Sequence, residues 1–140
     1  TTAYIIIGLI FIINLTFILM SLGILFGASF GAPFVPSGRR TVKKMLDIAQ
    51  IKKGSRVIDL GCGDGRLVFA SAKQGAKALG IEVSPPVYLL AKIRALFARQ
   101  KNAEIRFGNI FSKKHQKDIE RCDIIFVFLL KPLMTKIFRE

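Results

Sequence analysis

The sequence predicts an open, parallel α/β sheet with helices on both faces, preceded by a single transmembrane helix. Three observations lead to this fold class. The first 38 residues carry no charge, whereas all 22 Lys and Arg and all 9 Asp and Glu lie further along the chain. In that charged part, short apolar runs alternate with helical patterns, which is typical of parallel sheets. A glycine-rich loop follows the first apolar run, and ligands bind at such strand ends in open sheets.

The uncharged N-terminal part contains one long apolar run. Residues 4–28 read YIIIGLIFIINLTFILMSLGILFGA, and their only clearly polar side chains are Asn14, Thr16 and Ser21. A helix needs about 20 apolar residues to cross the hydrocarbon core of a bilayer, and this run is long enough. A cleaved secretory signal is the alternative, but its apolar region is usually only about 7–15 residues long. We therefore predict that residues 1–30 are an uncleaved membrane anchor.

Basic residues follow the predicted span directly, namely Arg39, Arg40, Lys43 and Lys44. Positive flanks stay on the cytoplasmic side, so we expect a single-pass membrane protein whose charged domain lies in the cytoplasm. The net charge of +13 suits an anionic membrane surface, which attracts each nearby basic residue by about 1 kcal/mol. Nucleic acid is the other partner that such charge favours. We rank it lower because no basic–aromatic stripe accompanies the charge, and a merely solvated basic surface is the third interpretation.

Residues 31–38, GAPFVPSG, form a Pro/Gly linker between the span and the predicted α/β domain of residues 39–140. Ser37 is a favoured capping residue for the helix that follows. The apolar positions of that helix have helical spacing, and they are Val42, Met45, Leu46 and Ala49.

Two strand–helix pairs come next. Residues 56–60, RVIDL, form a short buried strand, and the helical pattern of residues 65–75 ends at Gly75, a common residue just beyond a helix. Residues 78–83, ALGIEV, form the second strand. The helix over residues 84–102 begins with a serine cap and two prolines, which are favoured in a first turn.

The last predicted elements are a third strand at 104–110, a short polar helix or loop at 113–120, a fourth strand at 122–130 and a helix beginning at 131. The fourth strand is apolar on both faces, as a central parallel strand should be. Without another strand beside it, it would be a bare apolar edge. We therefore expect the sequence to be a fragment that lacks its C-terminal strands. It also starts at Thr1 rather than at Met, so first residues can be missing as well.

The loop after the first strand has the spacing G-x-G-x-G, at Gly61, Gly63 and Gly65, with Asp59 two positions before it. Glycines between a strand and a helix permit close approach of a ligand to the backbone and to the helix N-terminus. An acid at this place would repel a pyrophosphate but attract an ammonium group. Glu82 ends the second strand, where an acid can accept both hydroxyls of a ribose. The predicted ligand therefore carries a cationic amine and a ribose.

This pattern of an acid, G-x-G-x-G and a second acid resembles the class I S-adenosylmethionine-dependent methyltransferases, from about Thr41 to the C-terminus. The resemblance implies a Rossmann-like fold and S-adenosylmethionine as the cofactor. It also implies a role for each matching position. Asp59 matches the acid that holds the methionine amine, and the loop beneath the methionine and sulfonium matches Gly61, Cys62, Gly63 and Gly65. Glu82 matches the acid that binds the ribose, and Val83 matches the apolar residue against the adenine. Asn109 matches a position that is often Asp and that bonds the adenine amino group.

A closer resemblance covers more of the chain. A membrane span, then PFVPS at 33–37, a basic helix and DLGCGDGRLV at 59–68 resemble a small family of membrane-anchored protein-lysine methyltransferases. Its mitochondrial members modify the ATP synthase c subunit and the adenine nucleotide translocase. The resemblance implies a lysine of a membrane protein as the acceptor. It also implies that the linker residues Phe34, Val35, Pro36 and Ser37 lie over the cofactor site on the substrate side; a rigid linker is the alternative.

The end of the fourth strand borders the acceptor in such enzymes, and here it reads Leu130, Lys131 and Pro132. This is not the Asn/Asp-Pro-Pro-aromatic motif of nucleic-acid and glutamine methyltransferases, which argues against those acceptors. We assign no catalytic acid or base. Asp64 and Arg66 either pair with each other or cap a helix, and His115 is expected to be solvated among its neighbouring lysines.

Three other functions stay open. The first is a methyltransferase acting on a lipid or a small molecule at the membrane. The second is an inactive, truncated cofactor-binding membrane module. The third is a nicotinamide dehydrogenase, against which Asp59 and the tight glycine spacing count. The cysteines, Cys62 and Cys122, form no CxxC or Cys–His cluster, so we expect reduced thiols and no metal site.

Overall fold

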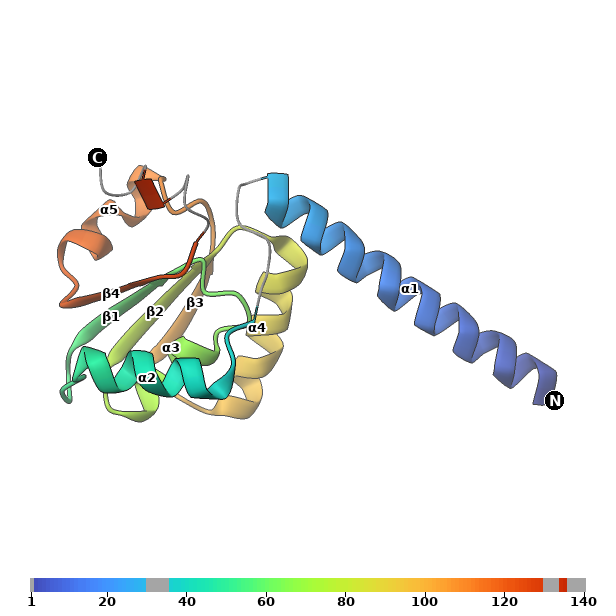
Figure 1. Cartoon of the computed structure of the whole chain (residues 1–140), viewed down its shortest axis with the longest axis horizontal. Coiled ribbons are helices and arrows are strands. Elements are labelled where there is room, and N and C mark those ends of the chain that lie inside the picture. The colour runs from blue at the N-terminus through green and yellow to red at the C-terminus, as the bar shows by residue number, and fades with distance from the viewer. Residues whose placement is uncertain (1, 30–35, 130–133, 136–140) are drawn as a thin grey trace.

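The computed structural model describes residues 2–29, 36–129 and 134–135. A long helix, α1 (Thr2–Ser29), extends away from a compact α/β unit (Figure 1). The unit contains four parallel strands in the order β3-β2-β1-β4. The predicted fold class, an open parallel sheet after an apolar helix, is therefore confirmed.

The strands are β1 (Arg56–Leu60), β2 (Lys77–Glu82), β3 (Ala103–Phe107) and β4 (Ile124–Val127). In the register, Leu60 pairs with Ile81, and Glu82 pairs with Phe107. The carboxyl ends of β1, β2 and β3 therefore meet at one edge of the sheet. The third and fourth strands are shorter than predicted, because a turn follows Phe107 and only the middle of the fourth apolar run pairs with β1.

Helices cover both faces of the sheet, as predicted (Figure 1). One face carries α2 (Arg39–Ala49), α3 (Arg66–Lys73) and α4 (Pro85–Ala98) over the larger core cluster. The other face carries α5 (Lys113–Glu120), whose Ile119 packs on Ile58, Leu60, Leu79 and Ile81. The predicted C-terminal helix falls largely outside the described residues; its residues 134–135 are helical.

Two helix ends differ from the prediction. Gly38, not Ser37, is the N-cap of α2, and no side chain caps that helix. The carbonyl oxygen of Ser37 instead accepts a hydrogen bond from the Arg66 guanidinium, in α3. Helix α4 ends at Ala98, earlier than predicted, because Arg99 adopts a left-handed conformation with φ 51°. Long-range contacts and backbone geometry thus decide both ends.

The apolar helix α1 satisfies its few polar groups within itself. Asn14, Thr16 and Ser21 each donate a hydrogen bond to the carbonyl oxygen four residues earlier. Such internal bonds are what a helix in hydrocarbon requires. Residues Thr2–Leu22 have a mean hydropathy of 2.7 and are not buried by the rest of the protein. By length and composition this helix could cross a membrane.

Strand β4 lies at the edge of the described sheet, where its one hydrogen-bonded neighbour among the described residues is β1. Ile125 of β4 and Phe128 just after it are exposed to 44% and 60%. An apolar edge of this kind was predicted from the composition of the fourth run.

Candidate functional site

The glycine loop between β1 and α3 has a backbone that favours glycine at three positions. Gly61, Gly63 and Gly65 have φ values of 78°, 58° and 76°, in the left-handed region that other residues rarely adopt. The Gly61 N–H donates to the carbonyl oxygen of Ile81 over 2.9 Å, which holds the loop against the end of β2. A Cβ added at Gly61 would lie 2.7 Å from Cδ2 of Leu129. The conformation therefore favours glycine here, and a larger residue would also require the end of the Leu129 side chain to shift.

The two predicted acids lie at the ends of neighbouring strands and are buried, Asp59 to 5% exposure and Glu82 to 8%. Glu82 joins the loop to the start of α4. Its Oε2 accepts the Gly63 N–H over 2.9 Å, and its Oε1 accepts the Ser84 N–H over 2.8 Å. The structure thus brings Asp59, the glycine loop and Glu82 together at the edge where the sequence placed them.

Asp59 has an unusual protonation equilibrium. Burial raises the pKa of Asp59 from 3.8 to about 7, and the neighbouring carboxylates of Glu82 and Asp64 act in the same direction. The ion pairs between described residues include neither Asp59 nor Glu82. A cation brought next to Asp59 would therefore stabilise its ionised form.

Cys62 contributes packing at this loop rather than a reactive thiol. Burial raises the pKa of the Cys62 thiol well above its usual value, and the charge of Asp59 acts in the same direction. A Cβ at Gly80 of β2 would lie 2.6 Å from the Cys62 sulfur. The sulfur therefore packs against β2 and occupies the space that Gly80 leaves.

Asp64 and Arg66 pair, which is one of the two alternatives left by the sequence, and the Asp64 Oδ1 also accepts the backbone N–H of Arg66, the first residue of α3, over 3.3 Å. Nη2 of Arg66 and Nη1 of Arg94 lie 2.6 and 2.7 Å from Oδ2 of Asp64. Although burial raises the pKa of Asp64, the hydrogen bond and charge of Arg66 and the charge of Arg94 outweigh it and lower that pKa overall. Because Arg66 also binds the Ser37 carbonyl, this cluster ties the end of the linker to the glycine loop. Sequence reasoning missed Arg94, which lies on α4 and far from Asp64 in the chain.

The adenine-side residues are placed less directly. Val83 follows β2 and is half-buried, while Asn109 is exposed after β3. The Asn109 Oδ1 accepts the Phe111 N–H over 3.0 Å, which is an ordinary turn contact. Ser84 occupies the N-cap position of α4 without capping it, and its 2%-exposed hydroxyl has no hydrogen-bond partner among the described residues. The predicted serine cap of α4 is therefore wrong, and Ser84 instead holds a buried hydroxyl close to Glu82 in the chain.

His115 corrects an expectation. The side chain is buried to 1% exposure, not solvated, because α5 turns it toward the sheet while its lysine neighbours face outward. A Cβ at Gly108 would lie 2.7 Å from the His115 Nε2. Burial, followed by the charges of Lys114 and Arg106, lowers the pKa of His115.

Several predicted substrate-side residues lie outside the described residues, namely Phe34, Val35, Leu130, Lys131 and Pro132. Of the rest, Pro36 is exposed and Ser37 is half-buried. Within the described part of the chain, no group of His, Cys, Asp and Glu side chains is suited to hold a metal ion.

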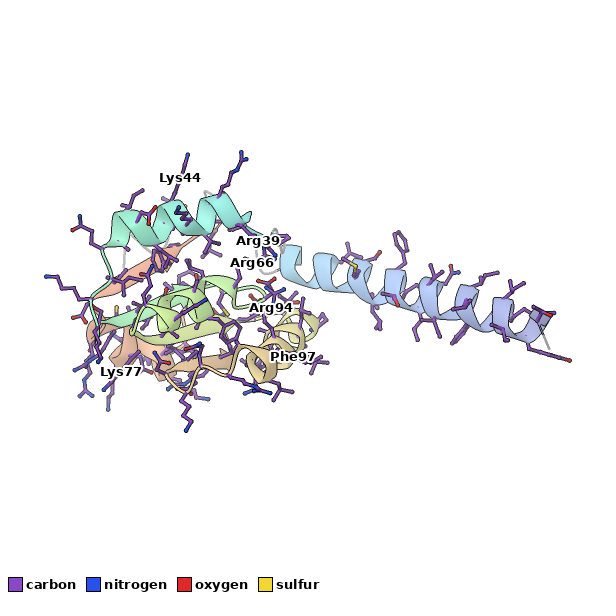
Figure 2. All side chains as sticks on the ribbon, turned by 90° about the horizontal axis from the view of Figure 1, so that it is seen from below. Arg39, Lys44, Arg66, Lys77, Arg94 and Phe97 are labelled. Carbon is purple, nitrogen blue, oxygen red and sulfur yellow. The ribbon has the colours of Figure 1, made fainter. Side chains whose placement is uncertain are left out.

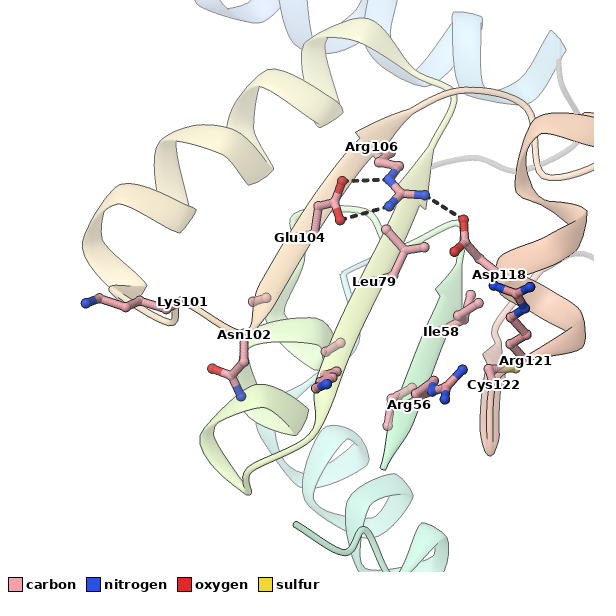
Figure 3. A pocket seen from close by; sticks show the side chains of 14 residues that line it. Arg56, Ile58, Leu79, Lys101, Asn102, Glu104, Arg106, Asp118, Arg121 and Cys122 are labelled. Carbon is pink, nitrogen blue, oxygen red and sulfur yellow. Dashed lines mark hydrogen bonds and ion pairs between the residues drawn. The ribbon is translucent and has the colours of Figure 1, made fainter. Parts of the chain in front are cut away.

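A separate hollow of about 520 Å³ lies on the α5 face, toward the amino ends of the strands (Figure 3). Its acids are neutralised internally. Arg106 Nε lies 2.6 Å from Glu104 Oε1, and Arg106 Nη1 lies 2.6 Å from Asp118 Oδ2. None of the predicted site residues lines this hollow, so the glycine-loop site and the hollow are distinct places on the sheet.

Comparisons with known proteins agree with this site. The family model described as ANTKMT methyltransferase domain matches residues 59–140. The chain is 36% identical over 106 residues to a protein-lysine N-methyltransferase of Saccharolobus islandicus (strain REY15A), covering 70% of this chain and 60% of that protein. It is 36% identical over 63 residues to the Homo sapiens lysine N-methyltransferase of the ATP synthase c subunit, covering 45% of this chain and 27% of that protein. The chain spans less than two thirds of the length of these curated relatives.

Solved structures show the same fold. An RNA methyltransferase from Salinibacter ruber, in complex with S-adenosyl-L-homocysteine, is 30% identical with a TM-score of 0.68, covering 75% of this chain and 67% of that chain. A dimethyladenosine transferase from Plasmodium falciparum is 22% identical with a TM-score of 0.58, covering 76% of this chain and 39% of that chain. The second likeness concerns the fold alone.

Proposed function

Because this chain belongs to the family of the ANTKMT methyltransferase domain, as its glycine loop predicted, we propose that it is an S-adenosylmethionine-dependent protein-lysine N-methyltransferase tethered to a membrane by α1. One observation carries the proposal. Two buried acids, Asp59 and Glu82, flank three left-handed glycines at the ends of neighbouring strands. The names of the curated relatives support a lysine acceptor, and the S-adenosyl-L-homocysteine in the Salinibacter ruber structure supports the cofactor.

The residues present suit this cofactor. Asp59 is a buried carboxylate whose pKa of about 7 falls when a cationic amine approaches, so it can hold the methionine ammonium. The main chain of Gly61, Cys62 and Gly63 would lie beneath the methionine. Each oxygen of Glu82 accepts one backbone N–H, and a carboxylate offers about four lone-pair sites, so the ribose hydroxyls still find acceptors.

The adenine end uses weaker contacts. Val83 offers half-buried apolar surface. The Asn109 Oδ1 is engaged by one N–H, and its second lone pair is free to accept the adenine amino group.

When bound, S-adenosylmethionine supplies an activated methyl group that a neutral amine takes in an in-line displacement. The residues of this chain align that amine and exclude water. The substrate lysine must first lose its proton, which burial away from water favours by lowering the pKa of the lysine. The bond from Arg66 to the Ser37 carbonyl supports placing the linker, Pro36 and Ser37 included, at the substrate side of the loop. The end of the fourth strand, at Leu130, Lys131 and Pro132, would border the same entrance.

The membrane part of the proposal depends on α1 and on charge. The helix is apolar along Thr2–Leu22 and unburied by the domain, and the basic residues of α2 begin at Arg39. Positive flanks favour a cytoplasmic domain. The acceptor would then be a lysine of a membrane protein close to that surface.

Calorimetric titration of the full chain in lipid nanodiscs tests the cofactor. We expect micromolar binding of S-adenosylmethionine and S-adenosyl-L-homocysteine, and none of NADH. Asp59→Asn should weaken binding by about 10–100-fold, since a hydrogen bond between charged groups contributes about 1.5–3 kcal/mol. Glu104→Gln is the matched control, an acid outside the site that should leave affinity unchanged. A folded chain that binds neither sulfur compound would contradict the proposal.

Transfer of a tritiated methyl group to membrane fractions tests the acceptor. We expect label in protein, recovered as methyl-lysine after acid hydrolysis. Label in the lipid extract would favour the lipid alternative, and label in added RNA would favour the activity named for the Salinibacter ruber relative. Binding without any transfer would favour a non-catalytic module.

A further inference from the structure

The outer surface of α4 is apolar although the helix already buries its inner side. Val87 and Ala91 face the core. Eight positions of α4 are exposed, and five of these are large and apolar, namely Leu89, Leu90, Ile93, Leu96 and Phe97. Leu96 and Phe97 are 74% and 80% exposed. A helix on the surface of a globular protein normally presents polar side chains to the solvent. The exposed apolar face of α4 therefore suggests that something else packs against it.

The five side chains form one stripe, which we call the α4 stripe. At about 100° per residue, they fall within an arc of about 120° around the helix axis. Lys92 borders the stripe at one edge, whereas Arg94 at the other edge is paired with Asp64. Residues 83–103 also include Arg99 and Lys101 and contain no Asp or Glu. An apolar face with long basic side chains at its edges is typical of helices that lie in a membrane interface.

The position of α4 identifies which surface the stripe would meet. Helix α1 contacts α4, and Figures 1 and 2 both show α4 on the side of the domain from which α1 departs. Figure 2 places Phe97 at that same side. The domain therefore presents its exposed apolar stripe and flanking cations toward the bilayer that α1 would enter.

We propose that the α4 stripe docks the domain on the lipid bilayer, with Leu96 and Phe97 inserted at the boundary between headgroups and acyl chains and with Lys92, Arg99 and Lys101 on anionic headgroups. This inference rests on the membrane anchoring proposed above. An interfacial helix buries its apolar face about 5–10 Å into that boundary. The chain would thus hold the bilayer at two places, by α1 and by α4.

Docking through α4 would also orient the cofactor site. Helix α4 begins at Pro85, directly after Glu82, Val83 and Ser84. The glycine-loop end of the sheet would then lie about one helix diameter, about 10 Å, from the membrane surface. The acceptors that this site can reach are amines held at the membrane boundary, rather than groups deep in either the cytoplasm or the bilayer.

Depth-dependent fluorescence quenching tests the docking. The sequence contains no Trp, so single tryptophans report their own positions. We compare Phe97→Trp with Ile48→Trp, which replaces an 82%-exposed side chain on α2, away from α4 in Figure 2. Phe17→Trp in α1 reports the anchor, and Leu89→Trp is a second position in the stripe. Each full-length variant is reconstituted in vesicles of phosphatidylcholine and phosphatidylglycerol with brominated acyl chains.

The expected result is that Phe97→Trp and Leu89→Trp each lose more than half of their emission to bromines near the headgroup end of the chain, and less to bromines near its middle. Ile48→Trp should keep its emission. If Phe17→Trp is quenched and both stripe positions are not, the docking is wrong while the anchor stands. Blue-shifted but unquenched emission from the stripe would instead show a protein partner there, and would overturn the proposal. If no position is quenched, both the docking by α4 and the anchoring by α1 are wrong. The cofactor titration is independent of either result.

Discussion

The two faces of this sheet treat their carboxylates in opposite ways. On the face covered by α5, Glu104 and Asp118 share Arg106, and the hydrogen bond with Arg106 lowers the pKa of Glu104. On the opposite face, at the carboxyl end of β1, Asp59 is buried beside Glu82 and Asp64, and its pKa rises to about 7. In the first arrangement the acids are paired within the protein. In the second, no ion pair between described residues includes Asp59, which is the basis for the ligand contact proposed above.

Asp64 shows that this difference is not a property of the region as a whole. It lies in the glycine loop that follows Asp59, but Arg66 and Arg94 neutralise it. Among the described residues, cations therefore pair with Asp64 and none pairs with Asp59. Raised carboxylate pKa values of this kind cluster at functional sites.

The largest expected effect that separates the two faces is the pH dependence of stability. The pKa of Asp59 rises from its ordinary value of 3.8 to about 7 in the folded chain. The folded state therefore holds more protons than the unfolded state between these values, so the free energy of unfolding falls as pH rises from about 4 to about 7 and stays low above that. At about 1.4 kcal/mol per pKa unit, the contribution of Asp59 reaches at most about 4 kcal/mol.

Asp59→Asn should remove this fall in stability, whereas Glu104→Gln should keep it. The measurement is urea unfolding in one detergent at several pH values between 4.5 and 7.5. Equal slopes for the wild type and Asp59→Asn would mean that the folded chain does not shift the pKa of this carboxyl, and the contrast between the two faces would disappear.

A smaller effect is expected from the glycines that lie before and after strand β1. Gly65 in the loop and Gly54 in the turn before β1 both have positive φ values, 76° and 89°, so alanine is strained at either position. At Gly65 an added Cβ would also lie 2.7 Å from Phe69 Cε2, while at Gly54 it meets nothing within 4 Å. Overpacking a core costs about 1–3 kcal/mol.

Gly65→Ala should therefore destabilise the chain by about 1–3 kcal/mol more than Gly54→Ala. Thermal melts followed by circular dichroism at a fixed pH give the comparison. Equal losses would show that backbone strain alone determines both positions and that the loop is not tightly packed against α3.

The smallest effect is expected for the paired acids on the α5 face. Glu104 and Arg106 form a largely solvent-exposed ion pair, and such pairs contribute about 0.2–1 kcal/mol. Glu104→Gln should lower the free energy of unfolding by less than about 1 kcal/mol and should lose part of that effect in high salt. A larger loss, insensitive to salt, would show that the carboxylate has a structural role that its exposure does not suggest.

The sequence predicted the local part of the site well. The apolar run, the glycine spacing and the following helix lie within one short stretch, so β1, the loop and α3 were predicted nearly to their bounds. Glu82 was placed correctly because parallel strands end at one edge. The misses involve contacts between distant segments. Arg94 reaches Asp64 from α4, Arg66 replaces a cap by binding the Ser37 carbonyl, and His115 turns inward onto Gly108.

The surface of α4 also shows what the sequence could not predict. Its prolines and apolar residues predicted a helix, but the pattern could not show which residues pack inside and which stay exposed. Only the packing of Val87 and Ala91 against the sheet reveals that Leu96 and Phe97 face outward. The exposed apolar face of α4 can be identified only when the residues that pack against the sheet are known.

Proton release on cofactor binding tests the central claim most directly, that Asp59 is left for a cationic ligand. The full chain is titrated with S-adenosyl-L-homocysteine at pH 6 and at pH 8, each in two buffers of different ionisation enthalpy. With a pKa of about 7, Asp59 is mostly protonated at pH 6, so binding should release about 0.9 proton there and almost none from Asp59 at pH 8. Asp59→Asn should abolish the release at pH 6. Tight binding at pH 6 without proton release, or with the same release in Asp59→Asn, would contradict the assignment of Asp59 to the ligand amine.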